Sequence, residues 1–315
     1  MEKKLYRLTP AYKDYLWGGN ELAENYHKDF GGKIIAESWE LSTHPDGVSE
    51  IENEPLDQFI EKHPEVLGTK CKGNDIPILI KYIDAAKALS IQVHPEDEYA
   101  RRVEHDNGKT EMWYIVDAKP GAFLYLGLNK SMDKETFAQH IKDHTLLDDL
   151  KKVPVKKGDS IVIRAGTIHA IAEGCLIMEI QERSNVTYRV YDFGRKDKDG
   201  NERPLHIDKA LQVAKLEPAD VNLKPEITGK EDETGRSDLL HTTEYFKVGH
   251  VHTLTERSIH VTEDSFMTLL LVHGNAEIIC GNETVQLKQG ESVFVPAGNT
   301  DVTVKGNCDI ITAEL

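Results

Sequence analysis

Short apolar runs and alternating patterns, separated by turn residues, dominate the chain. Alternation places every second side chain on one face of a strand, whereas an amphipathic helix repeats every 3.6 residues. The segments with strand patterns are residues 37–42, 76–83, 91–94, 111–116, 160–163 and 176–181. Helical spacing is found at residues 57–66, 97–105, 133–150 and 204–216. The pattern predicts a mainly β protein with a small helical insertion near residues 133–152.

One 14-residue segment occurs twice, 132 positions apart. Residues 156–169 align with residues 288–301, and five of the fourteen pairs are identical. Such a repeat indicates that one turn-strand-turn unit is built twice. An acidic stretch with Pro and Gly, residues 217–238, separates the copies as a linker would. We therefore expect two β-barrels, in domains 1–240 and 241–315.

The first copy ends in a candidate metal ligand and the second does not. His169 is expected to open a strand and to face inward, whereas Asp301 occupies the equivalent position of the second copy. The sequence therefore predicts metal binding in the first domain and a C-terminal barrel that lacks metal ligands.

Two further segments carry metal-competent side chains with strand spacing. Gln92 and His94 share one face of their strand, and Lys109, Glu111 and Trp113 share one face of the next. If these two strands are neighbours in one sheet, the amide, the imidazole and the carboxylate converge. Read alone, a His-Pro pair or a single strand Glu is more often a turn or a solvated face.

His169 strengthens the metal interpretation. Two imidazoles and a carboxylate, with an amide oxygen from Gln92, are a suitable ligand set for zinc and leave a position for water or substrate. Two His and one carboxylate also suit Fe(II), so a non-haem iron oxygenase is the alternative enzyme.

Basic residues near these segments are candidates for holding an anion. Arg189 lies in a run of strand formers, and Arg195, Arg164 and Lys109 are the other candidates. The alternative is that the arginines offset an acidic surface. Trp17, followed by two glycines, is either a surface turn residue or the wall of a ligand pocket.

Composition excludes several classes of protein. The 315 residues carry a net charge of -16, with 39% hydrophobic and 29% charged residues. An acidic chain is poorly suited to nucleic acid or an anionic membrane surface, and no apolar run is long enough to span a bilayer. The four cysteines have no paired spacing, so we expect buried thiols. We expect a cytoplasmic protein without nucleic-acid or membrane partners.

Six motifs together resemble those of the cupins and, more closely, of the type I phosphomannose isomerases in their short bacterial form. The motifs are W-G-G at 17–19, E-S-W-E-L-S at 37–42, S-I-Q-V-H-P at 90–95, G-K-T-E-M-W at 108–113, R-A-G-T-I-H-A-I at 164–171 and T-Y-R at 187–189. They span most of the chain, and their joint occurrence is far more specific than any one of them. The resemblance implies cupin-type jelly-roll barrels.

The resemblance also implies an activity and a set of residues. The activity is the zinc-dependent interconversion of mannose 6-phosphate and fructose 6-phosphate through an enediolate, with one Zn²⁺ per chain. The implied metal ligands are Gln92, His94, Glu111 and His169. Arg189 and Lys109 are the expected catalytic residues. The expected substrate-binding residues are Trp17, Ser90, Lys109 and Arg189.

Two departures from the longer members limit what the resemblance carries. The helical region is reduced, so contacts of their helical domain do not transfer. Asn185 stands where longer members have an Asp, so a base at that position is in doubt. A cupin that binds a sugar phosphate without turnover is a second alternative. The oligomeric state expected is a monomer or weak homo-oligomer.

Overall fold

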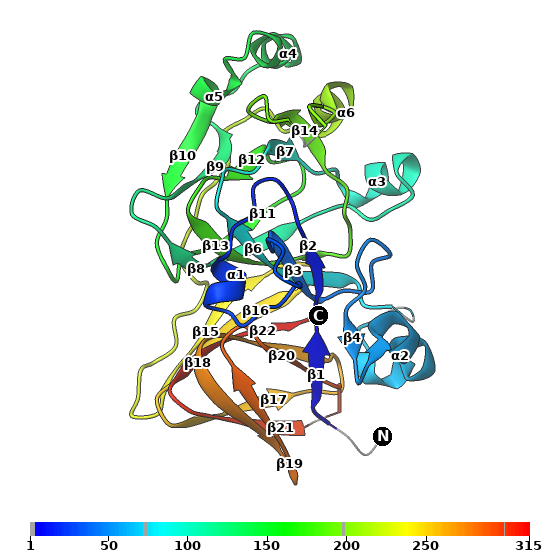
Figure 1. The fold of residues 1–315 in the computed structure, drawn as a ribbon, viewed down its shortest axis with the longest axis vertical. Helices are drawn as coiled ribbons and strands as arrows, with labels where there is room; N and C mark the ends of the chain where they lie inside the picture. Colours follow the sequence, from blue (N-terminus) through cyan, green and yellow to red (C-terminus); the bar gives the residue numbers. More distant parts are fainter. Residues whose placement is uncertain (1–3, 72, 74, 197–198, 299) are drawn as a thin grey trace. The chain divides into compact units, whose positions relative to one another are not determined.

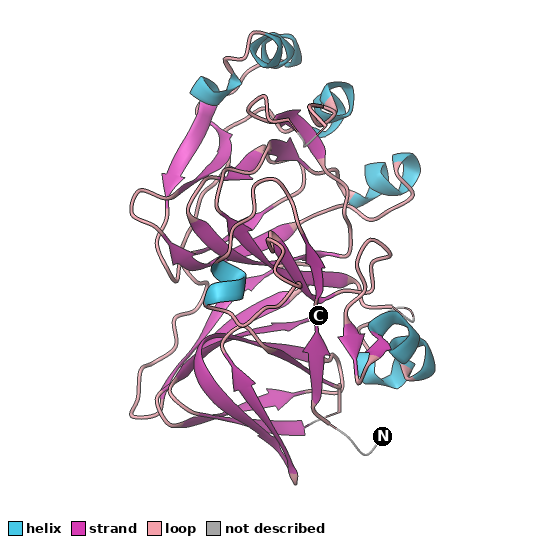
Figure 2. Ribbon diagram, viewed as in Figure 1, coloured by secondary structure: helices cyan, strands magenta, loops and turns pink. Residues whose placement is uncertain are grey.

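The computed structural model describes residues 4–71, 73, 75–196, 199–298 and 300–315. Within these ranges the structure contains 22 strands, six α-helices and one 3-10 helix, which confirms the mainly β prediction (Figures 1 and 2). The residues form two compact units. Unit 1 comprises residues 1–13, 20–82 and 224–315, and unit 2 comprises residues 14–19 and 83–223. The division of function at residue 240 stays a prediction.

Unit 1 contains the first and last parts of the chain. Its N-terminal elements are β1 (Tyr6–Thr9), β2 (Ala11–Lys13), α1 (Glu21–Glu24), β3 (Glu37–Leu41), β4 (Glu50–Ile51), β5 (Glu54–Pro55), α2 (Leu56–Lys62) and η1 (Pro64–Leu67). Its C-terminal elements are β15 (Gly235–Thr242), β16 (Lys247–Thr253), β17 (Glu256–Val261), β18 (Met267–Cys280), β19 (Glu283–Lys288), β20 (Ser292–Val295), β21 (Thr300–Lys305) and β22 (Cys308–Glu314). Strand β6 (Ile78–Ala85) contains residues of both units.

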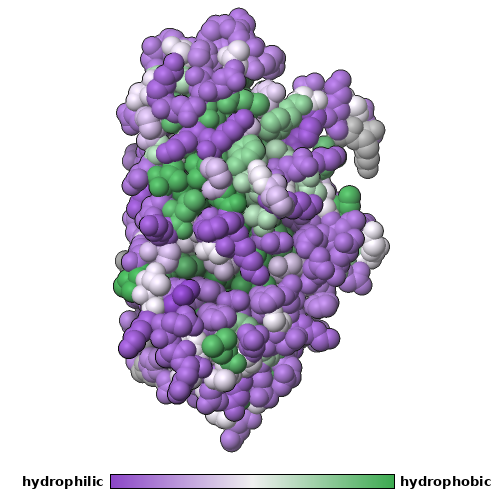
Figure 3. Space-filling model, turned by 90° about the vertical axis from the view of Figure 1, so that its left-hand side faces the viewer, coloured by the Kyte–Doolittle hydropathy of each residue, from purple (hydrophilic) through white to green (hydrophobic). Residues whose placement is uncertain are grey.

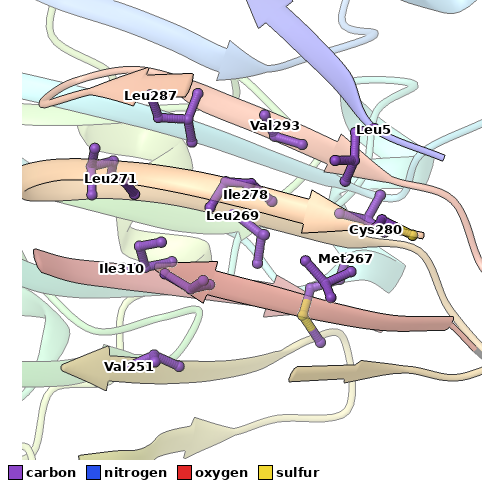
Figure 4. Close-up of a cluster of buried hydrophobic side chains, with 14 of the residues drawn as sticks. Leu5, Val251, Met267, Leu269, Leu271, Ile278, Cys280, Leu287, Val293 and Ile310 are labelled. Atoms are coloured by element: carbon purple, nitrogen blue, oxygen red, sulfur yellow. The ribbon is translucent and has the colours of Figure 1, made fainter. Parts of the chain in front are cut away.

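The sheet of unit 1 joins strands from both ends of the chain. Its order is β15-β16-β22-β18-β20-β1-β4-β5, with β17, β19 and β21 paired off this path. Long β18 pairs with four other strands, because its 14 residues extend beyond each of them. Leu269, Leu271, Ile278, Val293 and Ile310 are fully buried. They belong to the cluster of side chains drawn between the strands in Figure 4, which forms the core of this unit.

Unit 2 contains the remaining elements. They are β7 (Ile91–Val93), α3 (Asp97–Val103), β8 (Glu111–Ala118), β9 (Phe123–Leu128), α4 (Lys134–Lys142), α5 (Leu146–Asp149), β10 (Leu150–Pro154), β11 (Ser160–Ile163), β12 (His169–Ile171), β13 (Cys175–Glu182), β14 (Tyr188–Tyr191) and α6 (Ile207–Val213). One sheet has the order β10-β9-β12-β7-β14, and β11, β8 and β13 are neighbours in another. The helical pattern at 133–150 forms α4 and α5, but Leu150 begins strand β10 instead of ending a helix.

The structure bears out the sequence repeat in detail. Strand β20 begins and ends 132 positions after the corresponding residues of β11. A glycine lies two residues before each strand, and the two glycines have nearly the same φ. Gly158 has φ of 88° and Gly290 has φ of 90°, a conformation that side chains other than glycine rarely adopt. The two copies therefore use the same turn to enter the same short buried strand.

The face in Figure 3 is largely hydrophilic, with separate hydrophobic areas. Among the described residues, no helix is long and apolar enough to cross a membrane. All four cysteines are free thiols; three are buried as predicted, whereas Cys71 is only partly buried. Burial raises the pKa of the Cys175 thiol to about 12, so this group is unreactive near neutral pH.

Candidate metal centre

Two buried histidines, His94 and His169, each direct their Nε2 atom toward one point. Nδ1 of His94 lies 2.7 Å from the Val186 carbonyl oxygen, and Nδ1 of His169 lies 2.8 Å from the Thr167 carbonyl oxygen. A carbonyl only accepts hydrogen bonds, so both Nδ1 atoms carry the proton. The lone pair of each neutral ring is then on Nε2, as a metal ligand requires.

Glu111 completes the group. Its carboxylate oxygens lie 3.5 Å from Nε2 of His94 and 3.2 Å from Nε2 of His169. One ligand atom from each of the three residues lies within 4.8 Å of the others, and all three side chains are buried. Burial lowers the pKa of His169 to about 4, which keeps its imidazole neutral near pH 7. The donor set of two neutral imidazoles and one carboxylate fits a borderline divalent ion such as zinc.

The strands that carry this group lie in different sheets, so the three side chains converge without their strands being neighbours in one sheet. His94 follows β7 in the five-stranded sheet, whereas Glu111 begins β8 beside β11 and β13. Convergence comes from two sheets that place their inner faces toward one another. The Trp113 ring meets the His169 ring edge-on at 5.4 Å, which bridges the two sheets beside the ligands.

Gln92 lies beside the histidines as predicted. Residue pairing places it opposite His169 on β12 and opposite Arg189 on β14. Nε2 of its amide is 3.5 Å from Nε2 of His169, and Ser90 Oγ is 3.4 Å from its Oε1. Ser90, Gln92 and His94 thus follow one face of the β7 segment, with the amide nitrogen of Gln92 toward His169 and its oxygen, the predicted ligand atom, toward Ser90.

Lys109 is buried with its ammonium group in the cluster. Nζ lies 2.5 Å from Glu111 Oε2, 3.3 Å from His94 Nε2 and 3.4 Å from Glu179 Oε1. Trp113 Nε1 donates to the other oxygen of Glu179 at 2.6 Å. Sequence reasoning missed Glu179, although it lies in the strand 176–181 with its side chain in register with Trp113.

Arg189 is half-buried in strand β14, beside Gln92. Burial, and then the nearby charge of Arg203, lower the pKa of its guanidinium from the usual value. Nη1 donates to the Pro204 carbonyl at 3.1 Å. Arg195, another of the four candidates for holding an anion, instead donates to Asp192, as does Arg203. The single carboxylate of Asp192 is therefore shared by both of these cations.

Three other residues that the sequence analysis discussed lie outside the metal-competent group. Trp17 is buried, with its ring 5.6 Å from that of Tyr15, so it is not a surface turn residue. Arg164 is exposed on the turn after β11. Asn185 is also exposed, and its amide nitrogen in the main chain is 3.4 Å from Asp106 Oδ2.

A second histidine pair in unit 1 was also missed by sequence reasoning. His250 and His252 follow H-x-H spacing on β16, and each contacts Asp309 Oδ1, at 2.9 and 3.0 Å. Although burial raises the pKa of Asp309, the two histidines more than offset it and hold that pKa at about 2. The pair thus stabilises the ionised, partly buried carboxylate of Asp309 on β22.

Comparison with known proteins gives consistent matches over both parts of the chain. The family model of the phosphomannose isomerase type I catalytic domain matches residues 5–124, and that of the mannose-6-phosphate isomerase cupin domain matches residues 237–315. The mannose-6-phosphate isomerase of Streptococcus mutans is 34% identical over 99% of this chain and 98% of its own. Mannose-6-phosphate isomerase ManA of Bacillus subtilis is 33% identical over 97% of both chains.

A solved structure agrees with these matches. The crystal structure of the mannose 6-phosphate isomerase from Bacillus subtilis has a TM-score of 0.92 and 31% identity, over 99% of this chain and all of that chain. A mainly β chain with a cupin domain and a buried His-Glu-His group defines a cupin protein with a metal-competent site. Within that class, the chain belongs to the type I phosphomannose isomerase family.

Proposed function

We propose that this protein is a zinc-dependent isomerase that interconverts mannose 6-phosphate and fructose 6-phosphate. The observation that carries the proposal is the buried group of His94, Glu111 and His169, whose two imidazoles direct unprotonated Nε2 atoms at one point. Full-length relatives named for this reaction support the choice of substrate. The sugar phosphate is the partner that an acidic chain with a local group of cations can bind.

His94, Glu111, His169 and Gln92 would hold the metal. When bound, a divalent ion supplies Lewis-acid stabilisation of charge on a sugar oxygen, without any redox change. One Zn²⁺ per chain suits the nitrogen-rich donor set better than magnesium or calcium, which prefer oxygen ligands.

Two cations would act on the substrate itself. Isomerisation removes a proton next to a carbonyl and returns it to the neighbouring carbon, so negative charge builds up on the enediolate oxygens. Arg189, paired in register with Gln92, places a fixed positive charge at the edge of the site. Lys109 is held by Glu111 and Glu179 at the centre of the site, where its ammonium group can donate a proton or a hydrogen bond to a sugar oxygen.

The architecture proposed for this activity is a pair of cupin-type jelly-roll barrels with a helical insertion at α4 and α5. The first barrel would carry the chemistry and the second, with Asp301 in place of His169, would be structural. Asp301 supports this assignment because it is exposed and contacts His260 at 2.8 Å, whereas His169 is fully buried.

A coupled assay that detects fructose 6-phosphate formed from mannose 6-phosphate tests the proposal. We expect turnover with zinc and no consumption of oxygen when Fe(II) is supplied instead. Oxygen uptake with Fe(II) and no isomerisation would indicate an oxygenase. Binding of mannose 6-phosphate without turnover by folded, metal-loaded protein would indicate a regulatory cupin.

A further inference from the structure

The segment that carries Lys109 is fixed to the protein through its main chain. All three consecutive amides of residues 108–110 donate hydrogen bonds. Their acceptors, in order, are Asp97 Oδ1 at 2.8 Å, the Pro95 carbonyl at 3.1 Å and Glu182 Oε1 at 2.7 Å. Because each amide has its own acceptor, the backbone on both sides of Lys109 is held from the start of α3 and from the end of β13.

The packing around this segment is close. A Cβ on Gly108 would lie 2.5 Å from the Asp97 nitrogen and 2.8 Å from the Glu96 carbonyl carbon. Only glycine allows the two backbones to approach this far. The contact leaves residues 108–110 little freedom to shift while Asp97 and Glu182 keep their hydrogen bonds.

The two carboxyl groups also interact with each other. Glu182 is almost fully buried, and burial, followed by the charge and hydrogen bond of Asp97, raises its pKa to about 8. A protonated Glu182 can donate to Asp97 while its other oxygen accepts from the Thr110 amide. Asp97 and Glu182 are therefore joined to each other, and through the amides of Gly108 and Thr110 they hold the main chain on both sides of Lys109.

These groups act at the opposite end of Lys109 from its ammonium group. Glu182 bonds the main chain next to Lys109, whereas Nζ contacts Glu111, His94 and Glu179 in the centre. A lysine side chain has four rotatable bonds, so a fixed backbone is needed to hold its Nζ at one point. A displacement of about 1 Å at a reacting group can cost about 10²-fold in rate.

We propose that Glu182, together with Asp97, is a positioning residue that holds Lys109 in place for the reaction. The inference rests on the proposed function, because Lys109 is its proton or hydrogen-bond donor. The proposed role requires no contact of Glu182 with substrate or metal. Glu182 acts only through the main chain of residues 108–110.

Two substitutions of Glu182 separate positioning from simple packing. Glu182→Met keeps the length of the side chain but removes the acceptor for the Thr110 amide. Glu182→Gln keeps an acceptor oxygen and supplies an amide donor to Asp97, so it reproduces the protonated carboxyl group. Asp133→Ala is the matched control, because Asp133 accepts from the Thr136 amide at the same 2.7 Å in the same unit, at the start of α4.

The zinc-loaded full-length variants are compared in kcat, KM, zinc content and amide hydrogen exchange. For Glu182→Met we expect kcat to fall about tenfold or more, with KM and zinc content kept and with faster exchange at residues 108–110. Glu182→Gln is expected to rescue both kcat and slow exchange. Asp133→Ala is expected to change neither.

Three results would overturn the proposal. They are an unchanged kcat in Glu182→Met, a Glu182→Gln variant as impaired as Glu182→Met, and a loss of zinc that accounts for the lost turnover. Wild-type protein that converts no mannose 6-phosphate would instead refute the proposed function. In that case, amide hydrogen exchange of Glu182→Met and Glu182→Gln would still decide whether Glu182 holds residues 108–110 in place.

Discussion

At the scale of single residues, two main-chain carbonyls decide what the site can bind. Val186 and Thr167 fix the protons of His94 and His169 on Nδ1, and this leaves both Nε2 atoms as ligands. The sequence motifs identified both histidines, but a carbonyl acceptor has no side-chain signal. Its role was therefore visible only in the folded chain.

Arg189→Ala tests whether the guanidinium of Arg189 stabilises the negative charge that develops on the substrate. Loss of one preorganised cation near developing negative charge is expected to lower kcat by about 10²-fold, as for other groups that stabilise an oxyanion. Zinc content should stay at the wild-type level, because Arg189 lies beside Gln92 and outside the His-Glu-His group. Steady-state kinetics with elemental analysis would check both values. Unchanged turnover would remove Arg189 from the mechanism.

The raised pKa of Glu182 predicts that the unfolding free energy depends on pH. Its pKa is raised from 4.5 to about 8, so between these values the folded protein binds a proton that the unfolded chain releases. Its contribution to the unfolding free energy is complete below about pH 4.5 and is lost as the pH rises to 8. Glu182→Gln should flatten this part of the profile. Urea unfolding at pH 5, 6.5 and 8 would measure it, and parallel profiles of the two proteins would contradict the assignment.

At the scale of elements, turns and short strands followed closely from sequence, whereas sheet membership did not. The strand predicted at 160–163 is β11 without any change of bounds, and His169 opens β12 as expected. Both predictions rest on local turn chemistry. Strands β7 and β8 lie in different sheets, which the sequence could not decide, since alternation defines the face of a strand but not its neighbours.

Helices were predicted at the right places but too long. The helix expected at 204–216 spans only Ile207–Val213, and Leu150 belongs to β10. Apolar residues at helical spacing continue beyond the ends of both helices, where tertiary contacts override the local pattern. Glu179 was missed for a related reason, because a buried carboxylate in an apolar strand gives no periodic signal.

Gly108→Ala tests the close contact before β8. The new Cβ would overlap the Asp97 backbone, so the segment must shift, and we expect a loss of about 1–3 kcal/mol together with reduced kcat. Gly121→Ala is the control: its φ of 87° adds strain, but no atom lies within 4 Å of the new Cβ. It should lose stability without losing turnover. Equal kcat in all three proteins would show that the contact does not position Lys109.

At the scale of the whole molecule, stability and chemistry rest on different residues. The buried cluster of unit 1 contains only apolar side chains from several strands, and the candidate metal centre lies in unit 2. The repeat revealed that one supersecondary unit is used twice. It did not reveal that residues 20–82 group with residues 224–315, since compactness depends on contacts between distant segments.

Leu269→Ala tests this separation. Leu269 is fully buried on β18, and truncating a buried leucine costs about 2–5 kcal/mol through lost burial and the cavity left behind. We expect a lower Tm, with kcat per folded molecule and zinc content unchanged below the transition. Differential scanning calorimetry and kinetics at 25 °C would measure these quantities. A parallel loss of kcat would show that the core of unit 1 also shapes the site.

Zinc-dependent isomerisation is tested most directly by following one preparation of the protein through three states. Conversion of mannose 6-phosphate to fructose 6-phosphate is measured before chelation, after removal of metal, and after zinc is restored. We expect turnover that disappears on chelation and returns with zinc. Folded, metal-loaded protein that shows no conversion in any state, or conversion that survives complete removal of metal, would contradict this expectation.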